Sequence, residues 1–381
     1  MAGMTVPVPL PEADEVDLTP PSAELVELIG RGVATATAPP GGLVPLQRML
    51  LKAVSKEMTG HQVDPEGLAP LGPEGLAEAL RRRNLEFRTR ITHLLILCEL
   101  VLTPLPDEVS RRVGECAAAL GFHDGMIQVS RDYAAGSRGL AAVDFDRNGY
   151  TADWSEEQSA ALHTSRPLDM PWDFDAADSA LAARWASLEQ LAPNSLGRQV
   201  LDFYRARGFI VPGLPGSAPP YLAQHDWVHV LGDYGTTVEA EIEVFGLIAR
   251  AIPDPRGFSL LAMVISLFET GVMERGAGLF QADAHHLSRA GVAERLADAM
   301  RRGAQCGRDL MAVDYFDMAG MEVDAARNEL GIVAKSADAI DAGSVGPWEP
   351  GGISPFQLSA GRALAEQEGR EYDSLGATPP V

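Results

Sequence analysis

One segment, His225–Glu241, constrains the fold of this chain more than any other part of its 381 residues. It reads His-Asp-x-x-His, then eleven further residues, then Glu. Because each residue of an α-helix turns the chain by about 100°, His225, Asp226 and His229 leave one side of a helix within an arc of about 100°. Glu241 comes from the next helix. The segment therefore predicts two consecutive helices whose facing sides carry two imidazoles and two carboxylates.

These four side chains offer the donors of a metal site. Two nitrogen and two oxygen donors suit Zn, Fe or Mn better than Ca or Mg, which prefer oxygen. Leu222 completes an i, i+3, i+4, i+7 stripe with His225, Asp226 and His229, and such a stripe normally faces a core. Buried polar groups need partners, because leaving them unpaired is costly. A cation would satisfy them; hydrogen-bonded core histidines are the alternative.

The second helix is expected to begin at Thr236 or Thr237, both of which are residue types that cap helix N-termini. On this helix Glu241 shares an inward face with Phe245, whereas Glu243 points outward. The motif differs from the zincin signature, which needs Glu directly after the first His. The spacing therefore indicates a metal site of another kind.

The run His225–Leu231, followed by Tyr234–Thr236 and Glu241, resembles the metal motif of the coenzyme Q biosynthesis protein 4 family. The resemblance extends over residues 178–334, which is under half of the chain. Two departures touch no ligand position: Gly232-Asp233 stands where the family usually has Thr-Gly, and Ala240 stands in place of a glycine. The motif is fairly specific, whereas the flanking segments that also resemble the family, 193–208 and 302–332, only support it.

The resemblance implies an all-α protein with one divalent metal, usually described as zinc, bound by His225, Asp226, His229 and Glu241. These residues would be both metal-binding and catalytic. Family members act in ubiquinone biosynthesis, where they are credited with removing the C1 carboxyl group of a prenylated hydroxybenzoate and with oxidation at that carbon. The resemblance further implies an apolar groove for prenylated or isoprenoid lipids, and contacts with other quinone-biosynthesis proteins at a membrane.

The sequence leaves three functions open. The first is a metal-dependent decarboxylase, a lyase in which the metal is a Lewis acid; Fe would suit oxygen chemistry better than Zn, which has no redox chemistry. The second is a non-catalytic scaffold that binds prenyl lipids, because four protein ligands make a closed, structural site. The third is an unrelated metal-dependent hydrolase that has acquired this domain.

An apolar helix is expected over Gly257–Met273. A helix that is apolar on most sides is either buried in a core or lines a lipid groove. Its longest apolar run is too short to cross a bilayer. Four arginines are candidate partners of an anionic head group, with solvated surface positions as the alternative: Arg275, Arg301, Arg302 and Arg308.

The net charge of −22 disfavours nucleic acid and strongly anionic membranes as partners of the whole chain. The three cysteines Cys98, Cys116 and Cys306 are widely spaced, which indicates free thiols in a reducing compartment. The first residues lack the basic and apolar parts of a signal peptide and the arginines of a mitochondrial presequence. We therefore expect a cytoplasmic protein without a transmembrane segment that contacts a membrane peripherally.

Composition and periodicity divide the chain into four expected regions. They are a mostly disordered segment 1–42 with a short helix near 22–30, a separate helical module 43–155, the metal-binding helical domain 178–334, and an irregular tail 335–381 with a weak helix near 359–368. The helical module is interpreted as a docking or homo-oligomerisation domain.

Three further patterns could be mistaken for sites. Asp144–Tyr150 copies the first half of an EF-hand loop, but Ser155 stands where the twelfth position needs Glu, so a polar turn is the better interpretation. His123-Asp124 is interpreted as a helix cap. His285-His286 is expected either near the metal site or at the surface.

Overall fold

The computed structural model describes residues 6–122, 159–166, 172–252, 255–271 and 283–380, together with Gly125, Ile127 and Gln128. Within these residues the protein is all-α, as the sequence predicts. Two isolated bridges, between Ser195 and Glu322 and between Pro350 and Thr378, are the β-type pairings in this described part.

The helices are short to medium in length and follow one another through turns rich in glycine and proline. The first group is α1 (Ala23–Thr37), α2 (Pro45–Thr59), α3 (Pro73–Ala79), α4 (Leu85–Leu100) and α5 (Asp107–Ala119). The second group is α9 (Ser179–Ser187), the 3-10 helix η1 (Leu188–Gln190), α10 (Leu196–Arg207), α11 (Pro220–Gly232), α12 (Val238–Ala251), α13 (Pro255–Phe268), α14 (Val292–Cys306), α15 (Tyr315–Met318), α16 (Val323–Leu330), α17 (Ala337–Asp341) and α18 (Pro355–Gln367).

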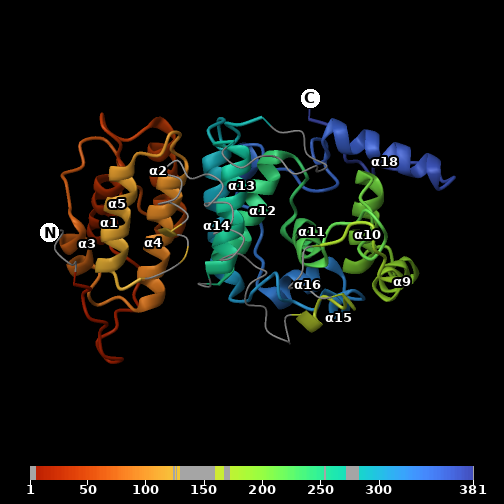
Figure 1. Cartoon of the computed structure of the whole chain (residues 1–381), viewed down its shortest axis with the longest axis horizontal. Helices are drawn as coiled ribbons and strands as arrows, with labels where there is room; N and C mark the ends of the chain where they lie inside the picture. The colour runs from red at the N-terminus through yellow and green to blue at the C-terminus, as the bar shows by residue number, and fades with distance from the viewer. Residues whose placement is uncertain are drawn as a thin grey trace.

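The helices are arranged along the long axis of the molecule (Figure 1). Helices α1–α5 form a bundle at one end, α12–α14 lie in the middle, and α9, α10 and α18 lie at the other end. Helix α2 packs against α14 and α4 against α13. A single cluster of buried apolar side chains extends from Val26 to Ile332. The expected separate module 43–155 is therefore packed against the rest of the chain, while its boundary lies largely outside the described residues and stays a prediction.

The N-terminal segment is more ordered than its composition indicates. Instead of a short helix near 22–30 in a mostly disordered segment 1–42, the structure has α1 over Ala23–Thr37, capped by the Ser22 side chain. Val26, Ile29 and Val33 make an apolar stripe that is buried against α3, α4 and α5. Because this stripe finds a core, its burial compensates for the cost of ordering the segment.

Helices α12 and α14 approach each other closely in the middle of the molecule. A side-chain carbon at Gly303 would lie 2.2 Å from the backbone oxygen of Leu247, so only glycine fits at this crossing. Glu243 was expected to point outward, but its side chain is buried and accepts a 2.6 Å hydrogen bond from Arg295 on α14. A buried carboxylate needs such a partner, which the helical periodicity of α12 alone does not show.

The C-terminal tail contains more structure than expected. Helix α18 begins with a capping box between Ser354 and Gln357 and packs against α10. Gly361 on α18 lies so close to α10 that an added side-chain carbon would be 2.3 Å from the oxygen of Ala206. The tail is thus attached to the helix that precedes the predicted metal motif.

Helix α13 is a core helix: Phe258, Leu261 and Ile265 are buried, and the helix packs against α12 and α4. Of the two interpretations of this apolar helix, a core helix or the wall of a lipid groove, the structure matches the first.

The cysteines are buried and free, and burial raises the pKa of Cys98 and Cys116 to about 12. Among the described helices, none has the length and apolar character needed to cross a bilayer.

Candidate metal centre

Helices α11 and α12 hold the predicted metal motif. Proline at its first turn begins α11, and Asp233 in the left-handed conformation (φ 58°) ends it. Thr237 caps α12 by accepting a hydrogen bond from the backbone N–H of Ala240, as the sequence predicts. The short turn between the two helices brings Glu241, in the first turn of α12, opposite the imidazoles of α11.

The structure brings together His225, His229 and Glu241. One potential ligand atom from each of these residues lies within 4.8 Å of the other two. The Nε2 atom of His229 is 3.2 Å from Oε1 of Glu241, and the Nε2 atom of His225 is 3.5 Å from Oε2. His229 and Glu241 are buried, whereas 16% of the His225 side chain is exposed. The cluster is therefore an inward-facing site with one partly accessible member.

Backbone carbonyls orient both imidazoles. Nδ1 of His229 donates a 2.8 Å hydrogen bond to the oxygen of Gly235, and Nδ1 of His225 donates to the oxygen of Leu222. Since a carbonyl oxygen only accepts, each ring carries its proton on Nδ1 and, when neutral, directs the Nε2 lone pair at Glu241. This is how metal-binding histidines are usually held.

One buried atom tests whether these residues fit a metal ion. Nε2 of His229 has no hydrogen-bond partner among the described residues, although a carboxylate oxygen faces it. Two lone pairs facing each other inside a protein repel unless a cation or a proton lies between them. The donors are two imidazole nitrogens and a carboxylate, a set suited to Zn and similar ions. The residues present therefore fit a divalent metal.

Asp226, the fourth predicted ligand, lies beside this cluster but is not part of the set within 4.8 Å. Its Oδ1 atom is 3.6 Å from Nε2 of His225, and its Oδ2 atom accepts a 2.5 Å hydrogen bond from the hydroxyl of Tyr204 on α10. One of the two carboxylate oxygens is thus already engaged by a side chain that sequence analysis did not identify.

Neighbouring charges and burial shift the pKa values of His225 and Glu241 in opposite directions. Burial lowers the pKa of His225, but the carboxylates of Asp226 and Glu241 outweigh burial and raise it to about 9. Burial raises the pKa of Glu241, but the imidazoles of His229 and His225 outweigh it and hold the pKa at about 2. For Asp226 burial dominates and its pKa is raised. The cluster thus holds an anionic carboxylate and attracts positive charge.

Aromatic rings enclose the cluster. Phe245 stacks on the His225 ring with centroids 5.0 Å apart, and Phe203 lies 5.4 Å from the His229 ring. Tyr204 precedes the motif by more than twenty residues, and no spacing rule connects it to Asp226. Its role became visible because α10 packs on α11.

The other sequence candidates do not join this centre. Arg302 is buried and donates to the backbone oxygens of Gly232 and Val333, so it stabilises the fold and does not bind a head group. Arg301 pairs with Asp298 at 2.6 Å. Arg308 is a surface residue 3.5 Å from Glu329, and Arg275 lies outside the described residues.

Of the histidine pair 285–286, His285 lies at the surface, as one of the two expectations has it, whereas His286 is buried but is not part of the three-residue cluster. His286 lies between Glu239 and Asp283, at 2.7 and 3.0 Å. His286 therefore ties α12 to the segment before α14. The EF-hand-like loop 144–150 and the His123-Asp124 pair lie outside the described residues.

Comparison with known proteins adds little. No family model and no curated protein matches the chain. Among solved structures, a proposed ubiquinone biosynthesis protein from Nostoc punctiforme is similar, with 19% sequence identity over 55% of this chain and 98% of that chain. The TM-score is 0.30, so this likeness carries no argument about the present protein.

Proposed function

We propose that this protein acts in quinone biosynthesis, where it binds a divalent metal ion and removes the C1 carboxyl group of a prenylated hydroxybenzoate. The observation that carries the proposal is the convergence of His225, His229 and Glu241, with both Nε2 atoms directed at one carboxylate. The pathway and the substrate come from the resemblance of the motif, and the geometry supports the metal-binding part.

The ligand set favours an enzyme over a scaffold with a structural metal. Structural zinc sites are closed by four protein ligands, whereas catalytic sites use three and leave one position for substrate or water. Here three side chains converge, and the second oxygen of Asp226 is occupied by Tyr204. We therefore propose His225, His229 and Glu241 as ligands and Asp226 as a neighbouring carboxylate held by Tyr204; zinc suits this set best, with Fe or Mn as alternatives.

The residues around the centre have definable roles. A bound divalent metal would supply a Lewis acid for the carboxylate or phenolate of the ring. His225 is the partly exposed member, so the carboxyl group of the substrate ring would approach past it, and the Phe203 and Phe245 rings would exclude water. Burial and Asp226 raise the pKa of Tyr204 well above its ordinary value, so its hydroxyl keeps its proton and orients Asp226.

The reaction balances without an oxidant. The bond between the ring carbon and the carboxyl group breaks, CO₂ leaves, and the electron pair that remains on the ring carbon takes up a proton. The apolar tail of a prenylated substrate is proposed to remain in contact with apolar surface or membrane, and partner enzymes of the pathway would supply and receive the product.

The test combines metal analysis with product detection. Purified protein is loaded with Zn, Fe or Mn in turn, and CO₂ release is measured from a carboxyl-labelled prenylated hydroxybenzoate. His229→Ala and Glu241→Gln should lose both metal and CO₂ release, while His285→Ala, an exposed control, should keep both. Stoichiometric metal without turnover would favour the non-catalytic scaffold, and absence of metal under all three loadings would overturn the proposal.

A further inference from the structure

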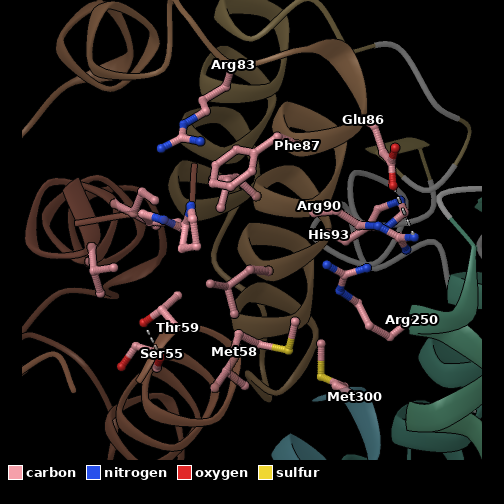
Figure 2. Close-up of a pocket in the computed structure, with 18 of the residues that line it drawn as sticks. Ser55, Met58, Thr59, Arg83, Glu86, Phe87, Arg90, His93, Arg250 and Met300 are labelled. Carbon is pink, nitrogen blue, oxygen red and sulfur yellow. Dashed lines mark hydrogen bonds and ion pairs between the residues drawn. The ribbon is translucent and has the colours of Figure 1, made fainter. Parts of the chain in front are cut away.

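A cavity of about 440 Å³ lies between the N-terminal bundle and the middle helices, formed by α1, α2 and α4 with α12–α14 (Figure 2). Its volume is in the range of small-molecule sites, which is about 300–1,000 Å³. Most of its wall is apolar, and aliphatic and methionine side chains from four helices contribute to it: Ile29, Leu51, Val54, Met58, Leu94 and Met300. None of the candidate metal ligands lines it.

Arg90 on α4 brings an incompletely paired guanidinium to this apolar cavity. Its side chain is 9% exposed, and its Nη1 donates to the backbone oxygens of Ala249 and Ile252. Its Nε, however, is buried and has no hydrogen-bond partner among the described residues. A buried donor left unpaired costs about 1–3 kcal/mol. A bound molecule that offers a hydrogen-bond acceptor to this Nε would remove that cost.

Arg250 on α12 adds a second positive charge at the same end. Figure 2 shows its guanidinium close to that of Arg90, whereas Arg83 lies apart from both. Within the described part of the chain, Arg250 forms no hydrogen bond or ion pair. Burial, together with the charge of Arg250, lowers the pKa of Arg90 to about 9.

Among the described lining residues, carboxylates do not neutralise this end of the cavity. Of the lining residues, Asp17 is 3.5 Å from Arg83 and pairs with it. Glu86 is 3.9 Å from Arg90 but is 57% exposed, so solvent screens it. Counting the residues that the structure describes, two guanidinium groups face one screened carboxylate, so their net charge is positive.

An apolar cavity with a positive end is complementary to an elongated apolar molecule with a negative end. We propose that this cavity binds a single-chain amphiphile with one anionic head group, a carboxylate or a phosphate. The alkyl chain lies among Leu51, Leu94 and Met300, and the head group accepts hydrogen bonds from Arg90 and Arg250. The guanidinium donors suit either head group, since they pair with two oxygens of a carboxylate or a phosphate.

Calorimetric titration of the full chain tests the head group. The probes are tetradecanoate, tetradecyl phosphate and tetradecanol, each below its aggregation concentration. The two anions should bind at least about tenfold more tightly than the alcohol, because a hydrogen bond to a charged group is worth about 1.5–3 kcal/mol. Equal affinity for the alcohol and both anions would overturn the role of the arginines. Binding of one anion alone would identify the head group.

Variants test the location. Arg250→Gln should weaken anion binding about tenfold and leave alcohol binding unchanged, while Arg111→Gln, an exposed arginine on α5, should change neither. Met58→Trp, at a half-buried wall position, should abolish binding of all three probes while the far-ultraviolet circular dichroism stays native. Unchanged binding in Met58→Trp, or in Arg250→Gln, would place the amphiphile elsewhere and overturn the proposal.

The proposed amphiphile site does not depend on the proposed metal chemistry. His229→Ala should bind tetradecanoate with the affinity of the native chain, because His229 does not line the cavity. Conversely, Arg250→Gln should keep its metal. Loss of one property without the other separates failure of this inference from failure of the decarboxylase proposal.

Discussion

The Nε2 atom of His229 lies 3.2 Å from Oε1 of Glu241, and both side chains are buried. The Gly235 carbonyl accepts a hydrogen bond from Nδ1 of this imidazole, so in the neutral ring the lone pair of Nε2 faces the carboxylate. Inside a protein this contact is repulsive unless positive charge lies between the two atoms. The pair therefore explains why a cation would stabilise the contact between α11 and α12.

Replacing His229 with alanine should weaken zinc binding more than about 100-fold, which is the upper range for losing a residue that merely orients a ligand. Elemental analysis after dialysis against a weak chelator measures the loss. His285→Ala serves as the control because His285 is exposed. Full metal occupancy in His229→Ala would exclude this cluster as the binding site.

Tyr204→Phe should lower the free energy of unfolding by about 1–3 kcal/mol, because it leaves the buried Oδ2 atom of Asp226 without its hydrogen bond. Urea denaturation measures this change. Metal stoichiometry should be retained in Tyr204→Phe and in Asp226→Asn if the three-ligand set is correct. Loss of metal in Asp226→Asn, with native secondary structure, would instead show that Asp226 is the fourth ligand.

Gly303→Ala should destabilise the protein by at least about 1–3 kcal/mol, because the new methyl group would lie 2.2 Å from the Leu247 oxygen and would force α12 and α14 apart. Gly320→Ala is the matched control, since nothing lies within 4 Å of an added carbon there; its effect should stay within about 0.5 kcal/mol. Thermal unfolding of both variants gives the comparison. Equal melting temperatures would contradict the close helix crossing.

Arg88→Ala should cost about 3 kcal/mol or more and release the first residues to proteases. The buried guanidinium of Arg88 donates to the backbone oxygens of Val8 and Pro9, and also to those of Arg81 and Arg83. Limited proteolysis with mass spectrometry of the fragments detects the release. Arg81→Ala, which removes a side chain that is 63% exposed, should be cleaved like the native chain.

Lowering the pH should weaken the hydrogen bonds by which Asp178, the N-cap residue of α9, holds this helix to residues 164 and 165. This buried carboxylate accepts hydrogen bonds from Ser165, Thr164 and Leu181. Burial raises the pKa of Asp178, but these hydrogen bonds outweigh it and hold the pKa below the ordinary value of 3.8. A carboxyl group with a lowered pKa contributes stability that is present above its ordinary pKa and is lost as the pH falls through the folded value.

Urea unfolding at neutral pH and at about pH 3 measures this effect. The native chain should lose stability between the two values, and Asp178→Asn should lose less, because it starts without the ionised acceptor. Asp175→Asn, at an exposed position of the same segment, should follow the native curve. Identical slopes for the native chain and Asp178→Asn would contradict the assignment.

Much of the site was accessible from local sequence rules. The spacing of His225, Asp226 and His229 depends only on helical periodicity, and Thr237 is a standard cap, so α11, α12 and their facing sides could be predicted. The full extent of helix α1 over residues 23–37 could not be predicted, because a short amphipathic helix becomes stable only when a core covers its apolar face. Glu243 escaped prediction for a similar reason, since its partner Arg295 lies on another helix.

The amino-acid sequence by itself determined the helical class and the identity of the candidate ligands, because both follow from interactions between residues a few positions apart. The tertiary structure decided which donors meet: one oxygen of Asp226 accepts a hydrogen bond from Tyr204, and three potential donors, His225, His229 and Glu241, converge. It also created the cavity where Arg90 of α4 reaches the backbone of Ile252. Such contacts join distant segments, and their geometry depends on how whole helices pack, which no local pattern encodes.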